Sequence, residues 1–208
     1  MIKKDILQII EKEKVVSIIR GLSFSQTKET IECLINSGVK VLEITMNSED
    51  ALEGISYSRE RYKEQAIIGA GTVLDVEDAR KAIEAGAQFI LTPSYSEDVV
   101  NYCNEKNVCI IPGVLTPSEI VAAYRNGCEM VKIFPVSAFS YDYISQISKP
   151  LDKIKFMAVG GINSKNINYY LENGAHCVGV GSLIDKGLIN KGDYEGLSKY
   201  VKNFLKNI

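Results

Sequence analysis

Residues 66–93 read AIIGAGTVLDVEDARKAIEAGAQFILTP and contain one complete strand–helix–strand unit. The two ends, AIIGAG and QFILTP, are short and apolar, as buried strands are. Between them, LDVEDARKAIEAG combines a polar cap, an amphipathic run and a closing glycine, Gly86, which together form the signature of a helix. Two buried strands joined by a helix predict parallel pairing with a right-handed crossover.

The same unit recurs along the chain. Strand followed by helix, many times over, predicts an α/β fold, a closed (β/α)8 or TIM barrel rather than a doubly wound sheet. Residues 1–208 are expected to form this one domain, with an extra helix at 2–13 before the barrel and a last outer helix at 194–207. The Val- and Ile-rich runs are 15–21, 39–45, 66–71, 88–93, 108–113, 130–135, 154–161 and 176–182, and further helix signatures are 23–38, 116–127 and 163–174.

Composition and charge exclude several classes of protein. The hydrophobic fraction is 46% and the formal net charge is −2, which gives no general basic field for nucleic acid. No apolar run is long enough to span a membrane, and the charged start of the chain is not expected to be a secretory signal. Five scattered cysteines without a CxxC pair are typical of reduced thiols, so a cytoplasmic location is expected. Because the single histidine, His176, has no second ligand near it in sequence, we expect no metal site.

One lysine interrupts an apolar run. Residues 130–135 read MVKIFP, and Lys132 stands in the middle. Because side chains alternate along a strand, Lys132 lies on the face opposite Val131 and Ile133. The wholly apolar face should pack on the outer helices, so Lys132 is expected to point into the barrel. The same alternation directs Glu43 of VLEIT into the barrel as well.

A buried lysine near a glutamate permits a defined chemistry. Burial disfavours the charged ammonium and lowers its pKa, so some neutral amine can attack a carbonyl group. The resulting Schiff base stabilises a carbanion on the neighbouring carbon, and Glu43 would transfer the protons. Lys132 and Glu43 are therefore the candidate catalytic pair. The alternative is an internal ion pair between them that only holds the barrel together.

Further candidates lie where the predicted strands end, because the chemistry of such barrels gathers at that face. Glycines close the last two runs, and backbone N–H groups at such positions bind phosphate. The alternative is that these glycines only form tight turns. The candidates at this face are Arg20, Asn47, Thr72, Pro93, Phe134, Gly160, Gly161, Gly181 and Ser182.

In combination these segments resemble a known family, the pyruvate-forming class I aldolases that cleave 2-keto-3-deoxy-6-phosphogluconate (KDPG) and 4-hydroxy-2-oxoglutarate (KHG). The resemblance covers nearly the whole chain, in order, through VLEIT, IGAGTVL, AGAQFILTP, IPGVLTPSE, VKIFP, VGGI and GVGS. It implies a cofactor-free lyase that acts on a small 2-keto acid phosphate and forms a cytosolic homotrimer of (β/α)8 barrels. The products would be pyruvate with glyceraldehyde 3-phosphate, or pyruvate with glyoxylate.

The resemblance also implies roles for single residues. Lys132 matches the Schiff-base lysine of K-x-F-P, and Glu43 matches the acid/base of L-E-x-T. Thr72 matches a threonine that contacts the bound pyruvyl part. Family residues that line the site or bind phosphate are matched by Pro93, Phe134, Gly160, Gly161, Gly181 and Ser182.

Some positions depart from the phosphogluconate branch of that family. Asn47 stands where many members have a substrate-binding arginine, and Val159 stands where threonine is usual. The combination E-I-x-x-N-S, K-I-F-P-x-S-A-F and A-V-G-G resembles instead the enzymes that cleave 2-keto-3-deoxy-6-phosphogalactonate, the C4 epimer. In that branch an arginine matching Arg20 serves the substrate. IPGVLTPSE resembles the phosphogluconate branch, so the preferred epimer stays open.

Two other functions stay open from the residues alone. One is a phosphate-binding barrel isomerase or epimerase that forms no covalent intermediate. The other is a sugar-phosphate-binding barrel without activity, for which the missing arginine at Asn47 is the only hint. Tyr141 and Tyr143, which follow the run of Lys132, are candidates for contact with substrate or with a neighbouring subunit.

Overall fold

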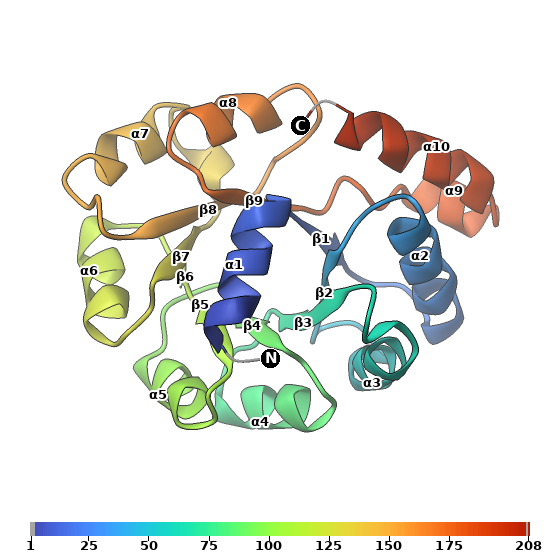
Figure 1. Cartoon of the computed structure of the whole chain (residues 1–208), viewed down its shortest axis with the longest axis horizontal. Coiled ribbons are helices and arrows are strands. Elements are labelled where there is room, and N and C mark those ends of the chain that lie inside the picture. The colour runs from blue at the N-terminus through green and yellow to red at the C-terminus, as the bar shows by residue number, and fades with distance from the viewer. Residues whose placement is uncertain (1–2, 207) are drawn as a thin grey trace.

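The computed structural model describes residues 3–206 and 208, and it has the expected fold, a (β/α)8 barrel with an additional helix at its start (Figure 1). The strands are parallel and follow the order β5-β4-β3-β2-β1-β9-β8-β7-β6 around the barrel. The strands are β1 (Val15–Ile19), β2 (Val41–Thr45), β3 (Ile67–Gly71), β4 (Phe89–Leu91), β5 (Cys109–Ile111), β6 (Gly113–Val114), β7 (Met130–Ile133), β8 (Lys155–Val159) and β9 (Cys177–Val180). The helices are α1 (Lys3–Glu13), α2 (Phe24–Asn36), α3 (Ala51–Tyr62), α4 (Val76–Glu84), α5 (Glu97–Glu105), α6 (Pro117–Arg125), α7 (Tyr143–Ser148), α8 (Ile167–Glu172), α9 (Lys186–Asn190) and α10 (Tyr194–Leu205), with a 3-10 turn at Val136–Ala138.

The fifth predicted strand is interrupted at Pro112, so the described residues contain nine strand segments where eight were expected. Its first piece, β5, pairs with β4, and its second piece, β6, pairs with β7. Pro112 has no N–H to donate, but its carbonyl accepts the backbone N–H of Lys132 at 2.9 Å. The N–H of Gly113 turns to the hydroxyl of Thr92 at 3.0 Å. The two pieces therefore close the barrel beside Lys132.

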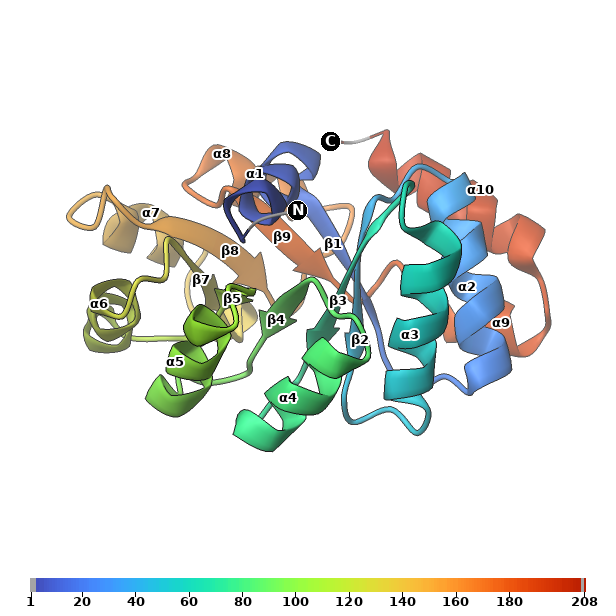
Figure 2. The ribbon, with the colours of Figure 1, turned by 60° about the horizontal axis from the view of Figure 1, so that its bottom comes forward.

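Apolar side chains form two shells, one on each side of the strands. The inner shell fills the barrel interior, and the outer shell packs between the strands and the helices. Helix α1 lies across one mouth of the barrel (Figure 2), where it adds Ile6, Leu7 and Ile10 to the inner shell. This is the mouth where the strands begin, because Lys155, the first residue of β8, pairs with Glu11 of α1 at 2.5 Å. The opposite mouth, at the strand ends, is left open for a site.

The helix signatures of the sequence correspond to α2, α4, α6 and α8. Helices α2 and α6 each begin with a complete capping box. The expected first and last helices are α1 and α10, although Ile2 and Asn207, which the predictions included, lie outside the described residues. Helices α3, α5, α7 and α9 follow strands as the repeat predicts, although no helix signature in the sequence marked their bounds. The first three begin without a hydrogen bond from a capping side chain. In the described part of the chain, no helix is long and apolar enough to cross a membrane.

Candidate functional site

Lys132 lies in the interior of the barrel, at the centre of β7. Its neighbours Val131 and Ile133 belong to the outer shell, while Met130 and Phe134 lie with the inner one, as the alternation predicts. The Lys132 side chain is only 4% exposed. Its ammonium nitrogen lies 5.1 Å from the centre of the Phe134 ring, which is within range of a cation–π interaction.

Glu43 enters the same interior from β2 and is 1% exposed. The space for its carboxylate comes from Gly71 on the neighbouring strand β3. A Cβ atom at Gly71 would lie 1.5 Å from Oε1 of Glu43, so no other residue fits there while Glu43 keeps its position. Within the described residues, neither carboxylate oxygen has a hydrogen-bond partner. Buried polar atoms are rarely left unpaired, so this carboxylate is available to a substrate or a water molecule.

Burial favours the neutral form of both groups, and it does so by changing the pKa of each. It lowers the pKa of the Lys132 amine, an effect that the Glu43 carboxylate opposes and the Arg20 guanidinium strengthens. It raises the pKa of Glu43, while the charges of Lys132 and Arg20 counteract the rise. No ion pair within 4.0 Å joins Lys132 to Glu43 in residues 3–206 and 208. The expected alternative of a stabilising internal ion pair is therefore not what this arrangement provides.

Arg20 stands at the end of β1, on the rim of the interior. Its guanidinium donates a hydrogen bond to the hydroxyl of Thr72 at 3.1 Å, which joins the ends of β1 and β3. Thr72 has a left-handed backbone, with φ of 57°. Gly21, which follows Arg20 in the chain, donates its N–H to the hydroxyl of Ser48 at 2.9 Å. These bonds hold the Arg20 side chain beside the open mouth.

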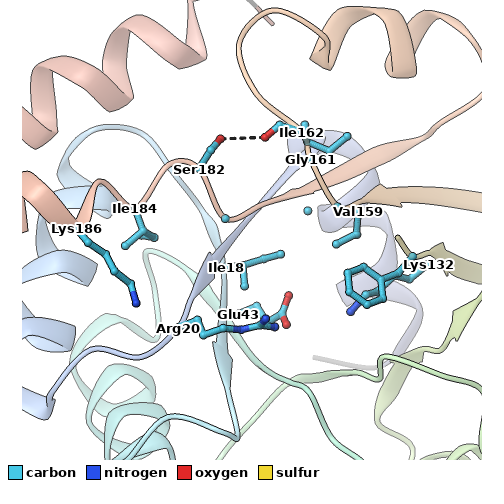
Figure 3. A pocket seen from close by; sticks show the side chains of 14 residues that line it. Ile18, Arg20, Glu43, Lys132, Val159, Gly161, Ile162, Ser182, Ile184 and Lys186 are labelled. Carbon is cyan, nitrogen blue, oxygen red and sulfur yellow. Dashed lines mark hydrogen bonds between the residues drawn. The ribbon is translucent and has the colours of Figure 1, made fainter. Parts of the chain in front are cut away.

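A cavity of about 360 Å³ opens at this mouth and brings most of the predicted residues together (Figure 3). Lys132 and Glu43 both reach it, although they come from opposite sides of the barrel. The lining residues are Ile18, Arg20, Glu43, Lys132, Phe134, Val159, Gly160, Gly161, Ile162, Gly179, Gly181, Ser182, Ile184 and Lys186. A volume of this size suits a small organic ligand.

The glycines that end β8 and β9 form one wall of this cavity. Gly160 and Gly161 have φ values of 104° and 75°, which favour glycine. A Cβ atom at Gly161 would also lie 2.8 Å from the side chain of Ser137, whereas one at Gly181 would meet nothing within 4 Å. The hydroxyl of Ser182 donates to the carbonyl of Ile162 at 2.9 Å and so ties the two loops together. The wall offers backbone groups and carries no charge of its own.

Three of the predicted site residues do not line the cavity. Thr72 is linked to it through the hydrogen bond from Arg20. Asn47 is exposed in the turn that follows β2. Pro93 is half-buried and packs behind Gly113, where an added Cβ atom would lie 2.4 Å from the Pro93 carbonyl carbon.

Six lining residues were not among the predicted site residues. Two of them had been noted in other ways, Val159 as a departure from the family pattern and Gly179 as part of GVGS. Ile18, Ile162 and Ile184 are apolar and read as core positions. Lys186 begins the short helix α9 soon after the glycines of β9. A signal for Lys186 was available, because a short helix after the last strand is a frequent part of phosphate sites in these barrels.

Cysteine and histidine chemistry lies away from this cavity. Burial raises the pKa of the Cys109 thiol to about 12, as expected of a packing group. His176, at the opposite mouth, accepts the Phe156 N–H on Nδ1 at 3.2 Å, and burial lowers its pKa. The described residues contain no group of three or more His, Cys, Asp or Glu side chains that could hold a metal ion.

Comparison with known proteins gives consistent matches. Residues 6–200 match the sequence model of a family described as KDPG and KHG aldolase. The chain is 30% identical over 196 residues to the KHG/KDPG aldolase of Escherichia coli K12, which covers 93% of this chain and 92% of that protein. It is 31% identical over 172 residues to the 2-dehydro-3-deoxy-6-phosphogalactonate aldolase of the same strain, covering 82% and 84%.

A solved structure with the same fold is the KDPG aldolase of Legionella pneumophila, in which pyruvate was captured at low pH as a covalent carbinolamine intermediate. The two chains superpose with a TM-score of 0.87 at 25% identity, over 92% of this chain and 93% of that one. This likeness extends the match from sequence to the arrangement of the whole barrel.

The burial of Lys132 leads to a testable pH dependence. Burial lowers the pKa of its amine, so an amine-specific reagent should modify Lys132 with a midpoint below 10.5, the ordinary value for lysine. Glu43→Gln removes the charge that opposes this effect, and the midpoint should move to still lower pH. Mass spectrometry of the Lys132 peptide across a pH series measures both midpoints. Glu49→Gln, at an exposed position outside the cavity, is the matched control. A midpoint at or above 10.5 would contradict the effect of burial.

Proposed function

Because the chain belongs to the KDPG and KHG aldolase family, we propose that it is a Schiff-base aldolase that cleaves KDPG to pyruvate and glyceraldehyde 3-phosphate, and KHG to pyruvate and glyoxylate. One observation carries the proposal. A buried lysine whose pKa is lowered shares a cavity with a buried carboxylate that has no partner among the described residues. A neutral amine and a proton acceptor in one enclosed site are what a Schiff-base mechanism requires.

The proposed reaction begins at Lys132. Its neutral amine attacks the C2 ketone of the substrate, and the hydroxyl of the carbinolamine takes a proton from Glu43 and leaves as water, which gives a protonated Schiff base and a Glu43 carboxylate. Glu43, through a water molecule, takes the proton of the C4 hydroxyl as the C3–C4 bond breaks and the aldehyde leaves. The bonding electrons pass to C3 and form an enamine, with the iminium nitrogen as their sink. Protonation of C3 and hydrolysis by water then release pyruvate and restore Lys132.

The raised pKa of Glu43 supports its part in this sequence. A carboxylate whose pKa is raised toward neutrality accepts and returns a proton more readily than an exposed one. Neither of its two oxygens accepts a hydrogen bond from a described residue, so both can accept one from the water molecule. Arg20, which carries a permanent charge at the cavity rim, is proposed with Thr72 to hold the substrate carboxylate.

The remaining residues are proposed to shape the two ends of the substrate. Phe134 provides an apolar wall beside Lys132, and Pro93 and Asn47 are proposed, from the family resemblance, to support the site from its rim. Backbone N–H groups are proposed to bind the phosphate through the loops after β8 and β9, which offer glycine backbone without side-chain charge. The residues of these loops are Gly160, Gly161, Gly181 and Ser182.

The C4 epimer, 2-keto-3-deoxy-6-phosphogalactonate, is the second candidate substrate. Val159 lines the cavity, so the wall carries a methyl group at the position of the usual hydroxyl. Arg20 is also in the lining, as the galactonate-type resemblance requires. Relatives of both kinds match this chain at similar identity.

We also propose, from the family resemblance, a cytoplasmic homotrimer. Phe139 and Tyr141, which are 40% and 54% exposed after β7, are candidates for the contact between subunits. Tyr143 is instead engaged inside its own chain, because its hydroxyl donates to the carbonyl of Leu115.

The covalent step can be tested directly. Borohydride added with pyruvate should reduce the Schiff base and leave a stable adduct on Lys132, which peptide mapping would locate. Lys132→Met should lose both the adduct and turnover, because no other lysine is buried among the described residues. An active enzyme without an adduct would favour a non-covalent mechanism, and an adduct on a different lysine would remove Lys132 from its role.

The role of Glu43 can be tested through the glycine that makes room for it. Gly71→Ala should displace the Glu43 carboxylate and lower kcat by about a hundredfold or more, the range lost when an acid/base is removed. Glu43→Gln should give a similar loss, while both variants still trap pyruvate on Lys132. Gly69→Ala is the matched control, since its Cβ atom would meet the Phe89 ring at 2.5 Å and not Glu43. Equal losses of kcat in the two glycine variants would contradict a specific effect on Glu43.

The substrate preference follows from one rate comparison. Values of kcat/KM for both C4-epimeric phosphorylated keto acids and for KHG rank the candidates. Val159→Thr should shift the ratio toward KDPG, because a hydroxyl then faces the cavity. An unchanged ratio would show that position 159 does not read the substrate.

A further inference from the structure

Lys186 is a cavity residue to which neither the sequence nor the proposed mechanism gives a role. It is the first residue of α9 and lines the same cavity as the glycines that end β8 and β9. Figure 3 shows its side chain along the cavity wall, with the amine directed toward the part where Arg20 lies. In the described residues no carboxylate forms an ion pair with it, and its recorded contact is the carbonyl of Gly21, at 3.5 Å. A contact of that length is weak.

The nearest acidic side chain in sequence is already engaged. Asp185 caps α9, and its Oδ1 accepts the N–H of Leu188 at 3.1 Å. The Lys186 ammonium is therefore an exposed cation at the edge of a cavity, and no carboxylate of the described residues neutralises it. Its long side chain can change rotamer at little cost, because it is not packed into either apolar shell.

The charges of the cavity are unevenly distributed. Its lining contains three cations, Arg20, Lys132 and Lys186, and one carboxylate, Glu43. Arg20 is engaged with Thr72, and Lys132 lies deep in the barrel. The glycine wall itself contributes only backbone dipoles, and the hydroxyl of Ser182 donates to a carbonyl. Of the three cations in the lining, Lys186 is the one that comes soon after the glycine wall in the sequence. It is also the one to which the proposed mechanism gives no role.

Gly21 makes the position of Lys186 available. A Cβ atom at Gly21 would lie 3.1 Å from the Lys186 nitrogen, and the φ of Gly21 is 63°, so both contact and backbone favour glycine there. The ammonium can consequently lie over the turn that follows β1, next to the cavity. The Arg20–Gly21 turn and the start of α9 bring a second cation to this mouth.

We infer that Lys186 determines specificity, by pairing its ammonium with the terminal phosphate of the substrate and so favouring phosphorylated aldehydes over unphosphorylated ones. This inference rests on the proposed aldolase function. A phosphate dianion held by neutral N–H groups gains from a nearby cation, and a charge-assisted hydrogen bond is about twice as strong as a neutral one. The phosphate lies several bonds from C3 and C4, so the pairing is the same before and during bond cleavage. Such uniform binding appears in KM and leaves kcat little changed.

A purely structural role makes a different prediction. If Lys186 only bridges α9 to the carbonyl of Gly21, its loss would loosen the cavity mouth for every substrate. The effect would then be equal for aldehydes with and without phosphate. Only a direct pairing of Lys186 with the phosphate would weaken the phosphorylated aldehyde more than the unphosphorylated one.

The test uses the reverse reaction, in which pyruvate adds to an aldehyde. Glyceraldehyde 3-phosphate and glyceraldehyde form a pair that differs only in the phosphate. In Lys186→Met, KM for glyceraldehyde 3-phosphate should rise about tenfold to a hundredfold, and the ratio of kcat/KM between the two aldehydes should fall by a similar factor. Lys186→Arg should keep most of the preference. Lys191→Met, at an exposed lysine just after the same helix, is the matched control for loss of charge.

Two further readouts separate the outcomes. The KM for glyceraldehyde 3-phosphate should depend less on salt in Lys186→Met, because an exposed charge pair is screened by ions. Pyruvate should still be trapped on Lys132 in all three variants. An equal loss for both aldehydes, or no loss, would overturn the role of Lys186 while leaving the aldolase intact. Failure of trapping in the unmodified chain would instead overturn the proposed function.

Discussion

Two opposite charges buried in one apolar interior, without an ion pair between them, are the constraint on which this structure depends. Neither Lys132 nor Glu43 recovers in full the hydration it loses on folding, and their pKa values shift toward neutrality as a result. Folding must therefore draw its free energy from elsewhere. It does so from two apolar shells, one inside the barrel and one beneath the helices, which together contain most of the buried side chains. The backbone of Lys132 is anchored as well, since its N–H donates to Pro112 where the fifth strand is interrupted.

The same constraint explains the glycines of β3. Gly69 and Gly71 face the interior on alternate positions, and each leaves space for a larger neighbour. The first accommodates the Phe89 ring, and the second accommodates the Glu43 carboxylate. An interior this densely packed does not admit a charged group by relaxing around it. The position of Glu43 therefore depends on the missing side chain at Gly71 of the next strand.

Much of this arrangement could be predicted from the sequence, because it follows from periodicity. Short apolar runs predicted the strands, and the alternation of side chains along them predicted the inward direction of Lys132 and Glu43. Glycine-closed helices gave the βα repeat and hence the barrel. What could not be predicted depends on contacts between distant segments. The space between Gly71 and Glu43, the break at Pro112 and the placement of Lys186 at the cavity each involve residues far apart in the chain. Asn47 and Pro93 show the converse, since both belong to strand ends but neither lines the cavity.

The closure of the barrel by α1 has a consequence for the order of events. The mouth where the strands begin is closed by Ile6, Leu7 and Ile10 of α1. Substrates and products therefore reach and leave Lys132 through the opposite mouth. In the proposed reaction, the fragment attached to Lys132 lies deeper than the aldehyde fragment. The aldehyde must then depart first and pyruvate last, and in the reverse direction pyruvate must enter before the aldehyde. A helix that never touches the substrate thereby imposes a sequence on binding and release.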